Sequence, residues 1–173
     1  MEDVIICPGS RSALLTLAFV RHGSFKVHII TDERSAAYIA LGMAQRTRKT
    51  VVIICTSGTA ALNFAPAVAE AFHQEVPLLV LTADRPVEWI GQYDGQTIFQ
   101  HNIYAHNIKA SYSLPSDKIH QDTIWYINRM VNEALIKTNS NNPGPVHINV
   151  PIREPFYPAK NESLNFNKDE RYI

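Results

Sequence analysis

Short runs of β-branched and aliphatic residues alternate along the chain with longer stretches whose apolar residues recur at helical spacing. The short runs predict strands at Val4–Cys7, Lys26–Thr31, Val51–Cys55, Leu78–Thr82, Ile108–Tyr112 and Val146–Val150. The longer stretches predict helices at Ser12–Arg21, Ser35–Arg46, Thr59–His73 and Ser116–Lys137, with a kink or break at Pro66. Most strand runs are apolar at consecutive positions, as in strands buried on both faces. The pattern therefore predicts an α/β fold, an open, doubly wound parallel sheet with helices on both faces.

Two segments do not follow this alternation. The stretch Asp84–Asn107 is long and polar, and loops of this length in a compact domain are usually functional or partly disordered. From Pro151 the sequence is rich in proline, asparagine and charge, which predicts a domain over residues 1–150 and a linker over 151–173. Doubly wound domains often have a helix before their first strand, so we expect this sequence to be part of a longer chain.

Composition narrows the class of protein. The 173 residues are 46% hydrophobic and 18% charged, as in a globular domain, and 16 basic residues balance 16 acidic ones. Such a chain has no overall field to attract nucleic acid or anionic lipid. No apolar run approaches the roughly 20 residues of a membrane span, and the N-terminus lacks the features of a signal peptide. Cys7 and Cys55 both end strand runs, so we expect two buried thiols in a reducing cytoplasm.

Polar residues, glycine and proline follow four of the predicted strands directly. These segments read CPGSRS, TDERS, CTSGTA and TADRP. Ligands of open parallel sheets bind outside the carboxyl ends of the strands. Because Arg11, Arg34 and Arg85 fall in these segments, we expect one edge of the sheet to be locally basic.

Each segment has a structural and a functional interpretation. Ser10 or Ser12 can cap the following helix, as can Thr56, Ser57 or Thr59 in the third segment. A hydroxyl, helix amides and a guanidinium can instead converge on a carboxylate or phosphate.

Similar alternatives remain open for the other polar residues. Asp32 or Thr31 can cap the next helix, which leaves Glu33 either as a first-turn acid or as a carboxylate set at the end of a strand for chemistry. Arg85 suits a surface ion pair, Gln96 and Gln100 are generic polar residues on local grounds, and Trp89 is interpreted as a packing group.

Six motifs occur in one order and at one set of spacings: CPGSRS, TDERSAAYIALGMAQ, CTSGTAALNFAPAVAEA, PLLVLTADRPVE, GQTIFQ and PGPVHINVPIREP. Together they closely resemble the N-terminal third of the MenD family, the thiamine-diphosphate-dependent SEPHCHC synthases of menaquinone biosynthesis. The resemblance implies that residues 1–150 form a pyrimidine-binding domain of the thiamine-diphosphate-binding fold. It also implies that residues 151–173 lead toward a missing middle domain.

The resemblance implies roles for particular residues. By motif position, Glu33 contacts the aminopyrimidine ring of thiamine diphosphate, which is held mainly by the partner subunit, and favours its imino tautomer. Further cofactor contacts fall on Pro8 and Thr56. The contacts to substrate and intermediates fall on Ser10, Arg11, Arg85 and Gln96. Gly95, just before Gln96, departs from the asparagine that is common there.

In the complete family enzyme, 2-oxoglutarate is decarboxylated and its succinyl semialdehyde unit is added to isochorismate. The motif for diphosphate and Mg²⁺ belongs to a C-terminal domain that this sequence lacks, so we expect the isolated chain to be inactive. Relatives assemble as homodimers or homotetramers. Two alternatives remain: the same domain of another thiamine-diphosphate decarboxylase or synthase, and a non-catalytic module for anion binding or assembly.

Overall fold

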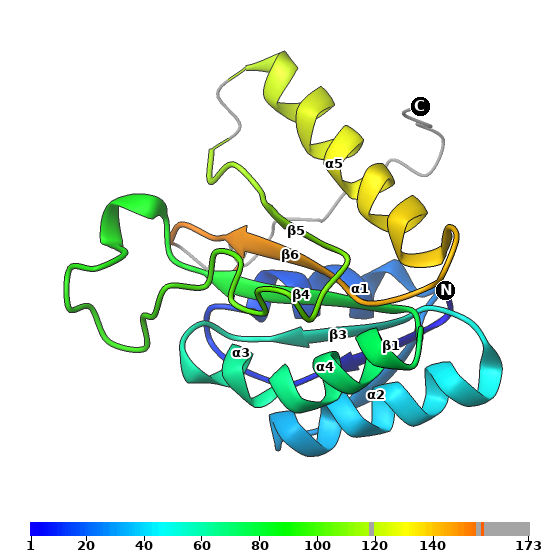
Figure 1. Ribbon diagram of the computed structural model, residues 1–173. Coiled ribbons are helices and arrows are strands. Elements are labelled where there is room, and N and C mark those ends of the chain that lie inside the picture. The colour runs from blue at the N-terminus through cyan, green and yellow to red at the C-terminus, as the bar shows by residue number, and fades with distance from the viewer. Residues whose placement is uncertain (118–119, 155–156, 158–173) are drawn as a thin grey trace.

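The chain folds around one parallel sheet. The computed structural model describes residues 1–117, 120–154 and 157. Its strands are β1 (Asp3–Ile6), β2 (Lys26–Ile29), β3 (Val51–Cys55), β4 (Leu78–Asp84), β5 (Ala110–Ser113) and β6 (Val146–Pro151). They pair in the order β2-β1-β3-β4-β6-β5, and every neighbouring pair is parallel. The predicted open, doubly wound sheet is confirmed (Figure 1).

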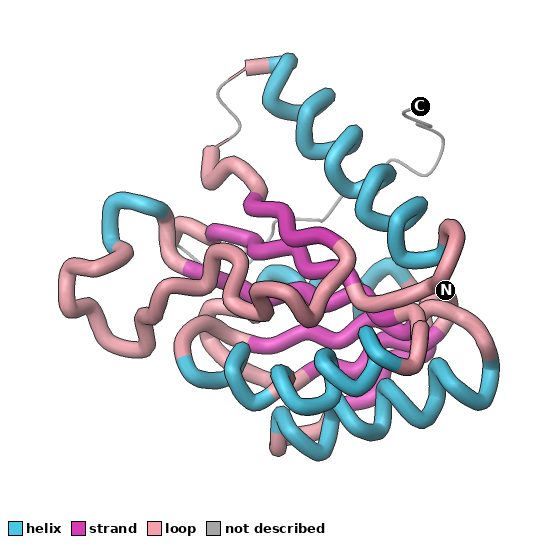
Figure 2. The backbone as a smooth tube through the Cα atoms, viewed as in Figure 1, coloured by secondary structure: helices cyan, strands magenta, loops and turns pink. Residues whose placement is uncertain are grey.

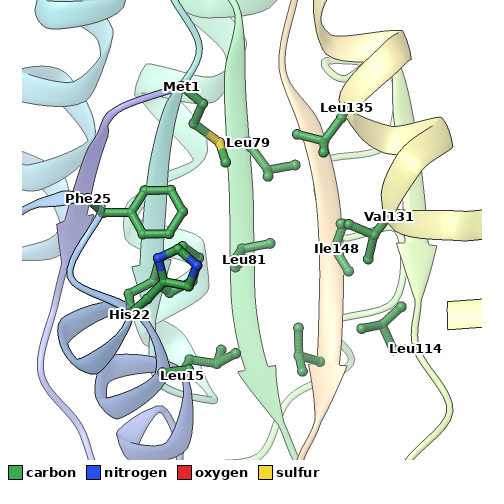
Figure 3. Close-up of a pocket in the computed structure, with 13 residues that line it drawn as sticks. Met1, Leu15, His22, Phe25, Leu79, Leu81, Leu114, Val131, Leu135 and Ile148 are labelled. Atoms are coloured by element: carbon green, nitrogen blue, oxygen red, sulfur yellow. The ribbon is translucent and has the colours of Figure 1, made fainter. Parts of the chain in front are cut away.

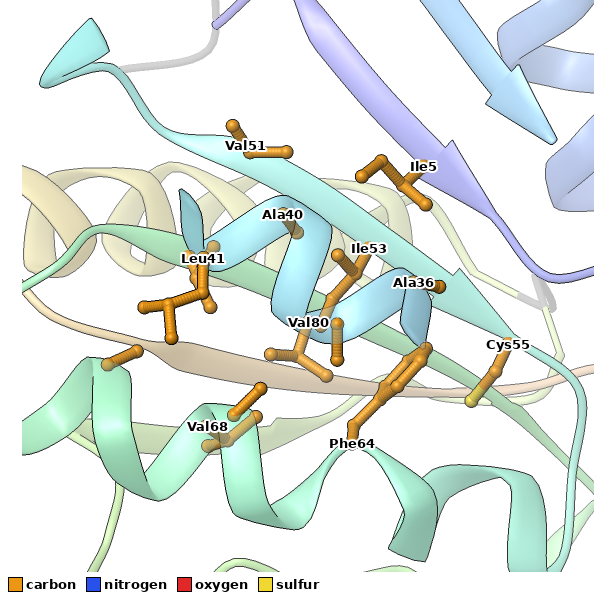
Figure 4. Packing of buried hydrophobic residues seen from close by; sticks show 14 of the residues in the cluster. Ile5, Ala36, Ala40, Leu41, Val51, Ile53, Cys55, Phe64, Val68 and Val80 are labelled. Atoms are coloured by element: carbon orange, nitrogen blue, oxygen red, sulfur yellow. The ribbon is translucent and has the colours of Figure 1, made fainter. Parts of the chain in front are cut away.

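Helices cover both faces of this sheet (Figure 2). They are α1 (Ala13–His22), α2 (Glu33–Thr47), α3 (Thr59–Asn63), α4 (Ala65–His73) and α5 (Gln121–Asn139), with a short 3-10 helix at Val87–Trp89. Helices α2, α3 and α4 pack on one face in a core that includes Ile53, Phe64 and Val80 (Figure 4). Helices α1 and α5 pack on the opposite face, against Val52 and Ile54. Because neighbouring side chains of β3 alternate between the two faces, the strand is buried throughout, as its continuous apolar run predicts.

The α1–α5 face is not fully covered. An apolar groove of about 380 Å³ lies between these two helices, above the central strands. Leu79 and Leu81 of β4, Phe25, and Leu135 of α5 line it (Figure 3).

The ends of the elements can be compared with the prediction. The break expected at Pro66 is confirmed, because α3 ends at Asn63 and α4 begins at Ala65. Helix α5 begins at Gln121 rather than Ser116, since the His120 ring accepts a hydrogen bond from the amide of Asp122 and so caps the helix. Strand β6 extends to Pro151, the first residue assigned to the linker. Residues 155–156 and 158–173 of the predicted linker lie outside the described residues.

We predict that Phe64→Ala lowers the free energy of unfolding by about 3–5 kcal/mol, the usual cost of removing a buried phenylalanine ring. Phe64 is fully buried between α3 and α4 and packs in the core of the α2–α4 face. Urea denaturation of the chain measures the change. Leu62→Ala, at an exposed position of α3, is the matched control and should change stability far less; equal losses in the two variants would contradict this account.

We also predict that stability falls in acid because of His147. This residue is fully buried in β6, between the hydroxyls of Thr82 at 2.8 Å and Ser111 at 3.1 Å. Burial, with a smaller contribution from His101, lowers the pKa of His147 from 6.5 to about 3. Between these pH values the unfolded chain binds the proton and the folded chain does not. This contribution is therefore complete above pH 6.5 and is lost by about 1.4 kcal/mol per pH unit as the pH falls.

Chemical denaturation at pH 7, 6 and 5 of the wild type and of His147→Gln measures this contribution. The variant has no imidazole to titrate, so its stability should depend less steeply on pH. Parallel pH profiles would rule out His147 as the source.

Candidate functional site

The carboxyl ends of β1, β2, β3 and β4 lie together at one edge of the sheet. The parallel register sets Ile6 beside both Ile29 and Ile54, and Cys55 beside Thr82. The four polar segments that follow these strands are thereby brought to the same edge, as the sequence predicts.

At the start of α2 the two acidic residues have different surroundings. Asp32 is the N-cap, and its carboxylate accepts a hydrogen bond of 2.7 Å from the amide of Ser35. Glu33 is partly buried, and its side chain makes no hydrogen bond or ion pair with the residues that the structure describes. The structural interpretation of this segment is therefore correct for Asp32 but does not account for Glu33.

The negative charge of Glu33 affects the cysteines at the ends of β1 and β3. Burial raises the pKa of the Cys7 thiol to about 12, and the nearby carboxylates of Glu33 and Asp32 contribute. Burial also raises the pKa of Cys55, with contributions from Cys7 and Glu33. Both thiols are buried and unbridged, as expected. Glu33 thus lies near the ends of β1 and β3, which are occupied by inert thiols.

The turns after β1 and β3 pack directly on each other. A Cβ atom on Gly9 would lie 2.4 Å from the Cβ of Thr56, so only glycine allows this approach. Thr56 is buried, whereas Pro8, which precedes Gly9, is exposed. The two residues that the resemblance assigns to cofactor contacts therefore lie on adjoining turns.

The capping roles considered for the serine and threonine residues are wrong. Ser12 is the N-cap residue of α1, but its hydroxyl donates to the carbonyl of Gly9 at 3.1 Å instead of accepting a helix amide. The N-cap of α3 is Gly58, with φ of 86°, and its amide donates to the side chain of Gln100 at 2.7 Å. The amide just before the first turn of α3 is thus satisfied by the distant Gln100.

Arg11 and Arg85 line one cavity of about 390 Å³. Nη1 of Arg11 donates to the carbonyl of Ile152 at 2.8 Å, and Nη2 lies 3.6 Å from Glu154. The pKa of Arg11 is lowered by burial and by the charge of Arg85. The described residues that line the cavity are Arg11, Arg85, Pro86, Trp89, Asp94, Arg153 and Glu154.

Arg85 is held by the loop that follows β4. It pairs with Asp94, donates to the hydroxyl of Ser57 at 2.7 Å and contacts the carbonyl of Gln96 at 3.5 Å. Arg85 lowers the pKa of the Asp94 carboxyl through this contact. The ion pair considered for Arg85 is therefore present, but it lies inside a cavity and not on an open surface.

Gln96 packs against the turn after β3 through its backbone. It has φ of 54°, and its carbonyl oxygen would lie 2.8 Å from a Cβ on Gly58. Its side chain is exposed, as is that of Ser10.

The structure separates residues that the sequence grouped together. The cavity brings Arg11 and Arg85 together, whereas Ser10, Glu33 and Arg34 are not among its lining residues. The third arginine that lines the cavity is Arg153, after β6, whereas Arg34 lies at the same edge of the sheet but outside the cavity lining. Trp89 is 53% exposed and lines the cavity, so its interpretation as a packing group is wrong.

A buried amide network behind the cavity was not identified from the sequence. Gln100 is 1% exposed and donates to the carbonyl of Ala83 at 3.1 Å and to the side-chain oxygen of Asn149 at 2.9 Å. Asn149 donates to Asp84 at 2.8 Å, and Asp84 accepts from the amide of Arg85. Burial raises the pKa of Asp84. The one sequence signal was polar residues inside apolar strand runs, such as Asn149 in β6.

Two further features bear on binding. Within residues 1–117, 120–154 and 157, no three His, Cys, Asp or Glu side chains are grouped to hold a metal ion. Over the same residues, every helix is too short or too polar to cross a membrane.

Residues 1–108 match the family described as thiamine pyrophosphate enzyme, N-terminal TPP binding domain. Three similar curated proteins each carry the name 2-succinyl-5-enolpyruvyl-6-hydroxy-3-cyclohexene-1-carboxylate synthase. The protein of Cytophaga hutchinsonii is 54% identical over 91% of this chain, that of Bacteroides thetaiotaomicron 48% over 95%, and that of Porphyromonas gingivalis 47% over 100%.

The aligned part is 28% to 30% of the length of these relatives, so the chain corresponds to less than a third of each. The family match covers β1 to β4 and the loop that carries Gln96 and Gln100, which are the segments that form the edge described above. On this evidence, the chain belongs to the thiamine pyrophosphate enzymes and contains their N-terminal TPP binding domain.

Proposed function

We propose that this chain is the pyrimidine-binding domain of a SEPHCHC synthase, which decarboxylates 2-oxoglutarate on thiamine diphosphate and adds the succinyl semialdehyde unit to isochorismate. The shared name of relatives that align with 91% to 100% of the chain supports the proposal. The observation in the structure that carries it is Glu33, a partly buried carboxylate whose neighbour Asp32 already caps the helix.

The carboxylate of Glu33 suits the aminopyrimidine half of thiamine diphosphate. When bound, thiamine diphosphate supplies a carbon nucleophile and the electron sink that decarboxylation needs. We assign to Glu33 the task of holding a proton between its carboxylate and a ring nitrogen of the aminopyrimidine. Pro8 and Thr56, on the adjoining turns, would contact the same ring. The proposal assigns the diphosphate and Mg²⁺ to the part of the full-length protein outside this chain.

The cavity of Arg11 and Arg85 suits the substrates. Isochorismate and 2-oxoglutarate both carry two carboxylates, and guanidinium groups bind carboxylates through paired hydrogen bonds in fixed geometry. We assign the orientation of substrate to Arg11, Arg85, Ser10 and Gln96. Because the two arginine side chains are only 9% and 12% exposed, their contacts with a ligand are less screened than surface ion pairs.

The proposal includes assembly as a homodimer or homotetramer in the cytoplasm. A cofactor held mainly by the partner subunit requires Glu33 to lie near an interface. Tyr38 and Ile39, on the same helix, are 47% and 46% exposed, which is consistent with a covered surface on α2.

Two alternative functions predict different results when the full-length protein is supplied with substrates. Another thiamine-diphosphate enzyme would keep the role of Glu33 but would condense pyruvate and leave isochorismate unchanged. A non-catalytic module would bind an anionic regulator in the cavity lined by Arg11, Arg85 and Arg153, here called the arginine cavity, and Glu33 would have no role in turnover. Full-length protein supplied with isochorismate and either 2-oxoglutarate or pyruvate distinguishes all three.

We predict that Glu33→Gln in the full-length protein lowers kcat by about 10²- to 10⁴-fold, the usual contribution of a positioned acid–base group. The melting temperature should not change, because the Glu33 side chain makes no hydrogen bond or ion pair with the described residues. Asp32→Ala is the matched control: it removes the cap of α2, so it should lower the melting temperature and retain turnover. Full activity in Glu33→Gln would remove the catalytic assignment.

The isolated chain of 173 residues should form no SEPHCHC when supplied with thiamine diphosphate, Mg²⁺, 2-oxoglutarate and isochorismate. The reason is that the proposal assigns the diphosphate and metal contacts to a region outside it. Isochorismate consumption followed by absorbance measures this, with the full-length protein as the positive control. Turnover by the purified chain would show that the division between domains is wrong.

A further inference from the structure

Arg153 is a third guanidinium at the arginine cavity, and two carboxylates fix its orientation. Its Nε and Nη2 atoms bind the two oxygens of Asp117, each at 3.0 Å. Nη2 also donates to Glu88 at 2.8 Å. Since the guanidinium is planar, contacts along one edge set the direction of the whole group.

The remaining nitrogen of this group is available to a ligand. Nη1 of Arg153 makes no hydrogen bond or ion pair with the described part of the chain, whereas its other two nitrogens do. The side chain is 41% exposed and lines the cavity beside Arg11 and Arg85. A guanidinium held by two carboxylates with one NH₂ group unused is oriented before any ligand binds.

The guanidinium groups of the cavity offer several contacts to a ligand that carries carboxylates. Arg11, Arg85 and Arg153 line it with Asp94 and Glu154, whereas Asp117 and Glu88, which bind Arg153, are not among its lining residues. Glu154 lies 3.6 Å from Arg11 and is 72% exposed, so this pair is long, screened and easily replaced. A ligand carboxylate that displaces Glu154 would lie against Arg11, in the cavity that Arg153 also lines.

We propose that Arg153 is a substrate-binding residue of the cavity and that, with Arg11, it selects an acceptor substrate that carries two carboxylates. This inference rests on the proposed function, in which the acceptor is isochorismate. It adds a residue from beyond β6 to the positions that the resemblance assigns. Arg153 has this place because Ile152, its neighbour, is tied to Asp84 by a backbone hydrogen bond of 2.9 Å.

The test is steady-state kinetics of the full-length protein with Arg153→Ala. We expect KM for isochorismate to rise about tenfold, the loss of one charge-assisted contact, while kcat and KM for 2-oxoglutarate stay within twofold. Arg153→Lys keeps the charge without the planar fork and should give a smaller rise in KM. Melting temperatures of both variants establish that they are folded.

Glu88→Gln is the control for a structural role. It removes one ion pair of Arg153 but leaves the guanidinium in place, oriented by both oxygens of Asp117. If Arg153 binds substrate, Glu88→Gln should leave KM for isochorismate within twofold of the wild type. If Arg153 only tethers Glu88, this variant should raise KM as much as Arg153→Ala does, and the inference is overturned.

The outcome separates this inference from the proposed function. An unchanged KM for isochorismate in Arg153→Ala overturns the inference while the synthase activity stands. A full-length protein that consumes no isochorismate with 2-oxoglutarate overturns the proposed function first. Calorimetric titration of isochorismate into wild type and Arg153→Ala then still tests the cavity, and equal affinities overturn the role of Arg153.

Discussion

The side-chain amide of Gln100 holds the functional edge of the domain together. Its oxygen satisfies the amide of Gly58 after β3, and its nitrogen satisfies Ala83 in β4 and Asn149 in β6. Each of these groups is buried, and a buried polar group left without a partner costs about 1–3 kcal/mol. One side chain therefore ties the ends of three strands to the long loop that follows β4.

The position of that loop determines the shape of the cavity. With Gln100 anchored, the preceding turn brings the backbone of Gln96 against Gly58 and brings Asp94 to Arg85. Asn149 binds Asp84, and the Asp84 carboxylate in turn accepts from the amide of Arg85. The guanidinium of Arg85 is thus oriented by its own backbone, by Ser57 and by the loop. Such contacts on several sides are what a binding group needs in order to be rigid.

Opposite charges occupy different parts of the same edge. Glu33 lies near the ends of β1 and β3, whereas the arginines line a cavity formed with the loop after β4 and the segment after β6. A Glu33 carboxylate engaged by one of these arginines would be a poorer proton acceptor, because the nearby positive charge favours its ionised form. Keeping Glu33 out of the cavity leaves both groups usable, in the arrangement that we propose for cofactor and substrate.

The sequence by itself determined the elements and the edge at which the polar segments meet. Continuous apolar runs such as Val51–Cys55 exist only where both faces of a strand are buried, and the polar segments after the strands share one edge in any parallel sheet. Asp32 as the cap of α2, and the break before Pro66, are also local effects and were predictable. Glu33, Arg11 and Arg85 were identified as candidates in this way.

Only the tertiary structure decided which of these residues share a cavity and what holds them. Gln100 and Asn149 are 49 positions apart, and no local pattern pairs an amide in a loop with an amide in a strand. For the same reason Arg153 joins Arg11 and Arg85 in the cavity while Arg34 does not, and the distant Gln100 accepts from the amide of Gly58. Local sequence specifies backbone conformation and burial. The choice of partner for a buried polar group is made among all groups that folding brings within hydrogen-bond distance.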